Sequence, residues 1–209
     1  VERDKIGGAG IFNGALSSKT MWELSTRFHN VKSQFPEGDQ DQFNIPFKHM
    51  ERTVGEAVFD RKTQLQVHIK LLKEKYGKYF TYARGYGLLL SKNEVLITKK
   101  KSATEIYAEN IIIATGSRPR KLDDIKADER TILTSDGIGS LKEFPKSMVI
   151  VGAGVIGCEF TTIFSNFGNT KVYLIDKADR ILPFEDQDIS DVVAANFEKK
   201  GVVIHKNAS

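Results

Sequence analysis

The chain has 209 residues, of which 40% are hydrophobic and 28% are charged, a composition typical of a soluble globular protein with one large or two small domains. Thirty-one Lys and Arg against 27 Asp and Glu leave a net charge of +4, and the densest basic run, three lysines at 99–101, is predicted to be a solvated turn. We therefore expect no nucleic-acid partner. No apolar run approaches the ~18 residues of a membrane span, so we expect no membrane partner. The single cysteine, Cys158, excludes an intrachain disulfide framework.

The first part of the chain is expected to contain a glycine-rich loop at 6–17 and then a helix with Ser18 as its N-cap. A long helix is predicted from Pro46 to Tyr76, because apolar residues recur there at helical spacing and proline suits a first turn. Short strands are expected at 79–84, 86–91, 94–99 and 111–114, the last of them buried, and a short helix near 136–141.

The pattern changes after Pro145, where three apolar strands alternate with two helices. The strands are predicted at 148–151, 172–175 and 202–204, and the helices at about 154–167 and 188–199. Alternation of buried strands with helices is typical of a parallel, doubly wound α/β sheet.

The strongest motif is the sequence Gly-Ala-Gly-Val-Ile-Gly at 152–157, directly after the strand predicted at 148–151. Here Gly152 permits a tight turn, Gly154 lets the backbone approach a pyrophosphate, and Gly157 lets the helix pack closely on the strand. The helix N-terminus then offers free N–H groups to phosphates. We predict that the dinucleotide is bound by Gly152, Gly154, Val155, Ile156 and Gly157.

Asp176 stands at the end of the next predicted strand, 19 residues after Gly157. An acidic side chain in this position accepts hydrogen bonds from an adenosine ribose and repels a 2′-phosphate. With Asp176 bound to the ribose, the site is therefore expected to bind NAD(H) in preference to NADP(H).

Residues 148–186 read MVIVGAGVIGCEFTTIFSNFGNTKVYLIDKADRILPFED. They resemble the NAD-binding segment of the FAD- and NAD-linked (class I) pyridine nucleotide-disulfide oxidoreductases, the family of dihydrolipoamide dehydrogenase. The string GAGVIGCE is most similar to the soluble pyridine nucleotide transhydrogenases. The resemblance covers nearly the whole chain and implies an N-terminally truncated Rossmann-type flavin domain at 1–144, followed by the first half of a Rossmann-type NAD domain at 145–209.

The resemblance also implies FAD as a cofactor beside NAD. Glu2 matches the acidic residue on the FAD ribose, Gly7 and Gly8 match a glycine pair near the pyrophosphate, and Ala-Thr-Gly-Ser at 114–117 matches a second flavin-domain motif. The FAD-binding residues implied in this way are Glu2, Gly7, Gly8, Ala114, Thr115 and Gly116. The catalytic residues implied are Lys19, beside the flavin N5, and Glu159, which pairs with it near the nicotinamide. No metal site is expected, because the four histidines show no common spacing.

The redox cysteine pair of the family is missing. Its two positions are occupied by Gly10 and Ala15, neither of which carries a thiol. A dithiol relay needs two sulfurs, so disulfide substrates are excluded by the usual route. Cys158 lies inside the predicted NAD helix and is expected to be a small buried residue.

Two functions remain open from the sequence. The favoured one is an oxidoreductase that passes hydride from a nicotinamide nucleotide to flavin and on to an acceptor that is not a disulfide, as a transhydrogenase does. The alternative is a relative without its redox disulfide that serves as a non-catalytic nucleotide-binding or scaffold subunit. Both ends of the chain look like cuts through a longer protein, which we expect to be a homodimer in the cytoplasm or the mitochondrial matrix.

Overall fold

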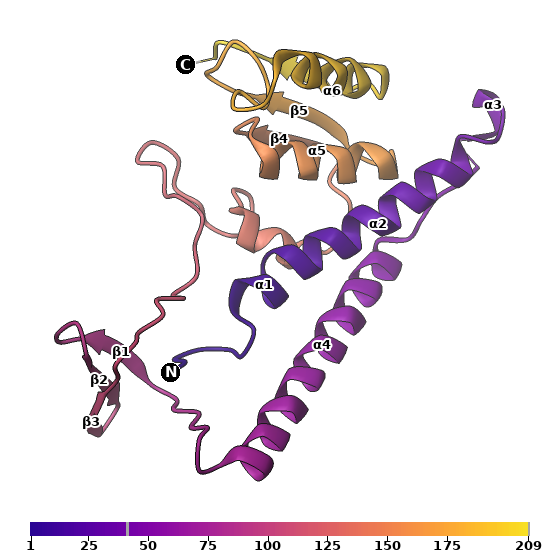
Figure 1. Ribbon diagram of the computed structural model, residues 1–209. Coiled ribbons are helices and arrows are strands. Elements are labelled where there is room, and N and C mark those ends of the chain that lie inside the picture. Colours follow the sequence, from indigo (N-terminus) through magenta and orange to yellow (C-terminus); the bar gives the residue numbers. More distant parts are fainter. Residues whose placement is uncertain (41, 209) are drawn as a thin grey trace.

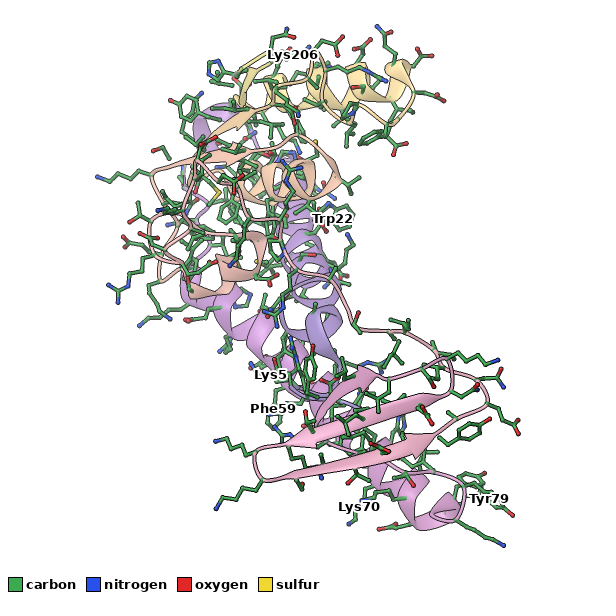
Figure 2. All side chains as sticks on the ribbon, turned by 90° about the vertical axis from the view of Figure 1, so that its left-hand side faces the viewer. Lys5, Trp22, Phe59, Lys70, Tyr79 and Lys206 are labelled. Atoms are coloured by element: carbon green, nitrogen blue, oxygen red, sulfur yellow. The ribbon has the colours of Figure 1, made fainter. Side chains whose placement is uncertain are left out.

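The computed structural model describes residues 1–40 and 42–208 and contains two three-stranded sheets joined to a pair of long helices (Figure 1). One sheet is antiparallel with the order β1-β2-β3, and the other is parallel with the order β4-β5-β6. In both views the two sheets lie far apart (Figures 1 and 2). The predicted α/β class is confirmed.

The C-terminal unit follows the predicted alternation of strand and helix. It consists of β4 (Ser147–Val151), α5 (Val155–Phe167), β5 (Lys171–Ile175), α6 (Gln187–Lys199) and β6 (Val203–His205). Both strand pairs are parallel, as expected for consecutive strands joined by helices. The order, with each new strand added on the same side, is that of one βαβαβ half of a doubly wound sheet.

Only one face of this parallel sheet is covered within the described residues. Val172 and Leu174 on β5 are 2% and 0% exposed and belong to the same buried cluster as residues of α5 and α6. By contrast, Val149 and Val151 on β4 are each 58% exposed. The expectation of a buried strand at 148–151 is therefore wrong for Val149 and Val151, because side chains alternate between faces and the helices of this unit cover one of them.

The N-terminal region begins with helix rather than loop. α1 (Gly8–Phe12) and α2 (Ala15–Lys32) occupy most of the segment expected to be a glycine-rich loop. The N-cap of α2 is Gly14, so the prediction of Ser18 as N-cap is wrong, and Ser18 lies buried inside the helix. Packing of this segment in the tertiary structure overrides the weak helix propensity of its glycines.

The predicted long helix is confirmed as α4 (Phe47–Tyr76), with Pro46 as its extended N-cap. A single turn, α3 (Glu37–Gln40), precedes it. Helix α4 lies beside α2 and extends from the C-terminal unit toward the antiparallel sheet (Figures 1 and 2).

The antiparallel sheet consists of β1 (Tyr86–Leu89), β2 (Glu94–Lys99) and β3 (Ser102–Tyr107). Its last turn contains two of the three lysines, as predicted, and β3 is a strand that the sequence interpretation missed. The strand expected at 79–84 forms only one bridge, between Arg84 and Glu2.

The buried strand expected at 111–114 is not formed. The segment is extended without ladder partners, and Ile112 and Ile113 are 91% and 68% exposed. No described strand pairs with it, so its apolar residues have no sheet to join. Farther along, the helix expected near 136–141 is a 3₁₀ helix at Ser135–Ser140.

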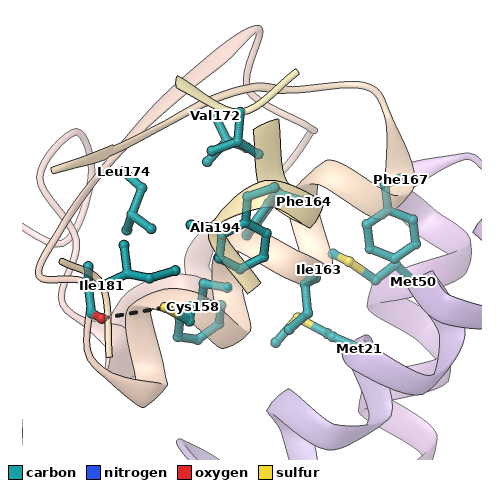
Figure 3. Close-up of a cluster of buried hydrophobic side chains, with 14 of the residues drawn as sticks. Met21, Met50, Cys158, Ile163, Phe164, Phe167, Val172, Leu174, Ile181 and Ala194 are labelled. Carbon is teal, nitrogen blue, oxygen red and sulfur yellow. Dashed lines mark hydrogen bonds between the residues drawn. The ribbon is translucent and has the colours of Figure 1, made fainter. Parts of the chain in front are cut away.

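One hydrophobic core joins the N-terminal helices to the C-terminal unit (Figure 3). Met21 on α2 and Met50 on α4 pack in the same cluster as Ile163, Phe164 and Phe167 on α5. This packing fixes α2 against α5 across the domain boundary predicted at residues 144 and 145. None of the helices in the described part of the chain combines the length and the apolar character needed to cross a membrane.

Candidate functional site

The glycine-rich turn lies between β4 and α5, as the motif predicts. Gly152 adopts φ +104°, a conformation that favours glycine, and its N–H donates to the Ile175 carbonyl at 2.8 Å. A Cβ on Gly157 would lie 1.8 Å from the Gly152 carbonyl oxygen. Only glycine at 157 lets helix and turn approach this closely.

The outer side of the turn is open. A Cβ on Gly152 or Gly154 would meet no heavy atom within 4 Å. Gly154 is the N-cap of α5 and provides no side-chain cap, and the first helical residues, Val155 and Ile156, are 66% and 59% exposed. The free N–H groups of this helix end and the open backbone fit the pyrophosphate of a dinucleotide.

Asp176 lies beside this turn and is held by the backbone. Its Oδ2 accepts a hydrogen bond from the Ala153 N–H at 2.5 Å, and its Oδ1 accepts one from the Ala178 N–H at 2.8 Å. The carboxylate therefore joins the turn to the end of β5. This hydrogen bond to the turn was not predicted from the spacing of Gly157 and Asp176. Its position at the strand end also fits the predicted contact with an adenosine ribose.

The loop after β5 also holds the glycine-rich turn through a backbone hydrogen bond. The Leu182 N–H donates to the Ala153 carbonyl at 2.8 Å, so both backbone groups of the fully buried Ala153 are satisfied. Arg180 holds this loop by donating to the carbonyls of Pro183 at 2.9 Å and Glu185 at 2.8 Å. Residues 181–186, ILPFED, match a segment that the family resemblance implies is a structural turn, whereas the role of Arg180 had no signal in the sequence.

Lys19 and Glu159, the two residues with implied catalytic roles, are in contact. The Lys19 Nζ donates to the Glu159 Oε1 at 2.5 Å, and Ser18 Oγ donates to the same oxygen at 3.3 Å. The Glu159 side chain is only 14% exposed, whereas that of Lys19 is 65% exposed. The ion pair joins α2 to α5 through two residues that are 140 positions apart in the sequence.

A groove of about 590 Å³ opens on the Lys19 side of α2. Gly10 and Ala15, the positions without thiols, line it together with Gly7, Lys19 and Arg61. A Cβ on Gly10 would meet nothing within 4 Å, so the backbone is open here as well. Arg61 lies on α4, and no sequence pattern predicted that it would line this groove.

The remaining residues implied for FAD occupy two separate segments. Glu2 accepts the Asp4 N–H at 2.8 Å and pairs with the backbone near Arg84, and Gly7 at φ +95° precedes α1 next to Gly8. Gly116 adopts φ +75° in an extended, exposed stretch. One segment contains Glu2, Gly7 and Gly8, and the other contains Ala114, Thr115 and Gly116. In the described part of the chain no hydrogen bond joins these two sets of residues.

Cys158 is buried, as expected, one turn into α5 (Figure 3). Its thiol donates to the Ala153 carbonyl at 3.4 Å. Burial, with a smaller contribution from the charge of Asp176, raises the pKa of this thiol to about 11. A thiol with so high a pKa is a poor nucleophile at neutral pH. Within residues 1–40 and 42–208, no group of three or more His, Cys, Asp or Glu side chains could hold a metal ion.

Known proteins of two related kinds are similar to nearly the whole of this chain. A dihydrolipoyl dehydrogenase of Bacillus subtilis is 33% identical over 97% of this chain, and a soluble pyridine nucleotide transhydrogenase of Sodalis glossinidius is 34% identical over 99% of it. Among solved structures, LpdA of Mycobacterium tuberculosis aligns with a TM-score of 0.81 at 25% identity, over 99% of this chain and 44% of that one. The HOCl-induced flavoprotein disulfide reductase RclA of Escherichia coli aligns with a TM-score of 0.75 at 25% identity, over 97% of this chain and 41% of that one.

The chain spans 43% of the length of both curated relatives. The model of the family described as "Pyridine nucleotide-disulphide oxidoreductase" matches residues 6–209. The resemblance inferred from the sequence is thus confirmed, and the chain belongs to the pyridine nucleotide-disulphide oxidoreductase family, whose members are FAD-dependent pyridine nucleotide oxidoreductases.

Proposed function

We propose that this chain is part of an FAD-dependent oxidoreductase that takes hydride from a nicotinamide nucleotide and passes the electrons to an acceptor that is not a disulfide. The observation that carries the proposal is the ion pair between Lys19 and Glu159 at 2.5 Å. It connects the helix that borders the open groove with the helix that begins at the nucleotide turn. A pair in this position is suited to act between two cofactors.

FAD, when bound, supplies the two-electron redox chemistry of such an enzyme. Lys19 would place a positive charge beside the site at which negative charge develops, which is electrostatic preorganisation. Glu159, held by Lys19 and Ser18, fixes the position of that ammonium group. Gly152, Gly154 and the N-terminus of α5 would hold the nicotinamide nucleotide through its pyrophosphate.

The absence of a reactive thiol supports a non-disulfide acceptor. Gly10 and Ala15 carry no sulfur, and Cys158 is buried with a raised pKa. Relatives include soluble pyridine nucleotide transhydrogenases, which by name act between nicotinamide nucleotides. A second nicotinamide, a quinone or another small acceptor would need no dithiol relay. We expect the complete protein to be a homodimer, as the family resemblance implies.

The test is an anaerobic stopped-flow measurement of flavin reduction by NADH in the complete protein. Glu159→Gln keeps the size of the side chain but removes the charge that orients Lys19. We expect the reduction rate to fall about 100-fold, with a similar effect for Lys19→Met, because removal of one preorganised electrostatic group lowers a rate about 100–1000-fold. A long-wavelength thiolate–flavin band is not expected in the reduced protein.

The matched control is Glu56→Gln, which removes an acid from an exposed ion pair with Arg52 on α4. It should leave the reduction rate unchanged. A Glu159→Gln variant that is reduced as fast as the parent would contradict the role of the ion pair. A complete protein that contains no flavin, or whose flavin NADH does not reduce, would favour a scaffold function instead.

A further inference from the structure

A second, smaller pocket lies at the opposite end of the parallel strands from the glycine-rich turn. Its volume is about 280 Å³, and it is lined by the end of α5 and the loop after it, by the start of β5, and by residues 200–202 between α6 and β6. Lys171, which begins β5, lines it, whereas Ile175, which ends β5, accepts the hydrogen bond of Gly152. The pocket therefore lies at the amino-terminal edge of the sheet, away from the predicted dinucleotide site.

The ammonium groups of two lysines in this pocket donate hydrogen bonds to neutral acceptors. The Lys171 Nζ donates to the Gly201 carbonyl at 2.7 Å, and the Lys200 Nζ donates to the Asn166 Oδ1 at 2.5 Å. Among the residues that the structure describes, no carboxylate lies within 4.0 Å of either ammonium group. Because an ammonium group has three N–H donors, each lysine keeps two for a further ligand.

A third lysine borders the same pocket. The Lys32 Nζ, at the end of α2, lies 3.6 Å from the position that a Cβ would take on Gly168, which lines the pocket. The pKa of His29 is lowered by burial and, to a smaller extent, by the charges of Lys200 and Lys32. The positive potential of these lysines therefore extends to His29. Burial also lowers the pKa of Lys200.

Helix dipoles do not balance this charge. Helices α5 and α6 end at Phe167 and Lys199, next to the pocket, and each C-terminus carries roughly half a negative charge. Together they offset about one of the three ammonium groups. The pocket remains positively charged.

Thr170 is a buried polar residue at the edge of the pocket. It lines the pocket, is only 7% exposed, and its hydroxyl has no hydrogen-bond partner in the structure. A buried hydroxyl without a partner is unfavourable by about 1–3 kcal/mol in general, so such groups normally face a ligand or water. The hydroxyl oxygen itself has almost no accessible surface, so the ammonium groups of Lys171 and Lys200 are the donors available to a ligand in the pocket.

We propose that this pocket binds a small dianionic oxyanion, a phosphate group, through Lys171 and Lys200. Several donors converging on a positively charged pocket match the several oxygens and the double charge of phosphate better than the single charge of a carboxylate. The inference does not depend on the hydride chemistry proposed above, since it concerns the other edge of the sheet.

The experiment is calorimetric titration of the complete protein with inorganic phosphate, repeated with glycerol phosphate and with acetate. We expect binding of phosphate, and Lys171→Met or Lys200→Met should weaken it roughly tenfold each, as expected for a charge-assisted hydrogen bond. Equal binding of glycerol phosphate would identify a phosphate monoester as a ligand, and binding of inorganic phosphate alone would identify the free ion; both support the pocket. Acetate bound as tightly as phosphate would overturn it.

Three control variants separate binding from folding. Lys206→Met removes the same charge after the other end of β6 and should leave phosphate binding unchanged. Lys171→Arg keeps the charge and should retain binding. Thr170→Val should leave phosphate binding unchanged, because the Thr170 hydroxyl is buried and does not reach the pocket. No phosphate binding by the parent, or equal weakening in Lys206→Met, would overturn the proposal.

Discussion

Two regions of this chain have similar apolar sequences but opposite burial. Val172 and Leu174 are buried in a parallel strand, whereas Ile112 and Ile113 are exposed in an extended stretch that joins no sheet. Both segments read as short apolar strands in the sequence. The difference is that β5 has partners on both sides, β4 and β6, and two helices on one face, while 111–114 has no described strand beside it. A strand is thus formed by its neighbours as much as by its own residues.

The same contrast holds for packing. Phe164 and Phe167 on α5 are fully buried in a core that also includes Met21 and Met50, so the nucleotide turn rests on a well-packed base. The antiparallel sheet is mostly exposed: all residues of β1 and β3 are accessible, and Ile97 is its buried residue. We therefore expect the stability of the chain to depend mainly on the C-terminal unit, and the following variants test that expectation.

The largest effect is expected from Phe164→Ala. The side chain is 0% exposed, and truncation of a buried phenylalanine leaves a cavity, so the free energy of unfolding should fall by about 3–5 kcal/mol. Ile113→Ala, at a 68% exposed position, should change it by less than about 0.5 kcal/mol. Urea denaturation measures both. Similar losses of free energy of unfolding in the two variants would mean that the segment 111–114 is packed against another part of the protein.

Within the nucleotide turn, Gly157→Ala and Gly154→Ala should have different effects. A Cβ at 157 would collide with the Gly152 carbonyl at 1.8 Å, so Gly157→Ala should lower the free energy of unfolding by about 1–3 kcal/mol or more. A Cβ at 154 meets nothing within 4 Å, so Gly154→Ala should leave stability nearly unchanged and weaken NADH binding. Thermal unfolding and NADH titration measure the two effects. A stable Gly157→Ala variant would argue against close packing of α5 on the turn.

Asp176→Ala should affect both stability and nucleotide preference. It removes the acceptor of the Ala153 and Ala178 N–H groups, which should lower the free energy of unfolding by about 1–3 kcal/mol. It should also narrow the difference between NADH and NADPH in kcat/KM, because the carboxylate no longer repels a 2′-phosphate. Asp176→Asn keeps an acceptor oxygen and should recover part of the stability but not the preference. An unchanged preference in both variants would remove Asp176 from the ribose site.

The smallest effect concerns pH and Cys158. Its pKa is raised to about 11 from an ordinary value near 9, so the unfolded chain loses the proton first as the pH rises. Stability from this group is therefore complete below pH 9 and declines between about pH 9 and 11. Thermal unfolding of the parent and of Cys158→Ala from pH 8 to 11 measures the difference. A parent and variant that lose stability in parallel would show that another group causes the decline.

Much of the candidate site could be predicted from local sequence. The glycine motif, its strand and its helix are contiguous in the chain, and the conformations of Gly152 and Gly157 depend on that local turn. The contact of Lys19 with Glu159 was implied only by the family resemblance, because no rule of spacing connects residues 140 positions apart. The turn that carries Leu182 lies in the segment ILPFED at 181–186, which the family resemblance implies is a structural turn. The hydrogen bond from the Ala153 N–H to Asp176 and the approach of Arg61 to the groove had no signal in the sequence.

The sequence by itself determined the α/β class, the long helix α4, the alternation of strand and helix after residue 145, and the dinucleotide motif, since these depend on periodicity and on short-range sterics. Only the tertiary structure decided which apolar strands are buried, where α2 begins, and which side chains meet across α2 and α5. Burial depends on which neighbours cover a residue, and hydrogen bonds between distant segments form only when packing brings the segments together.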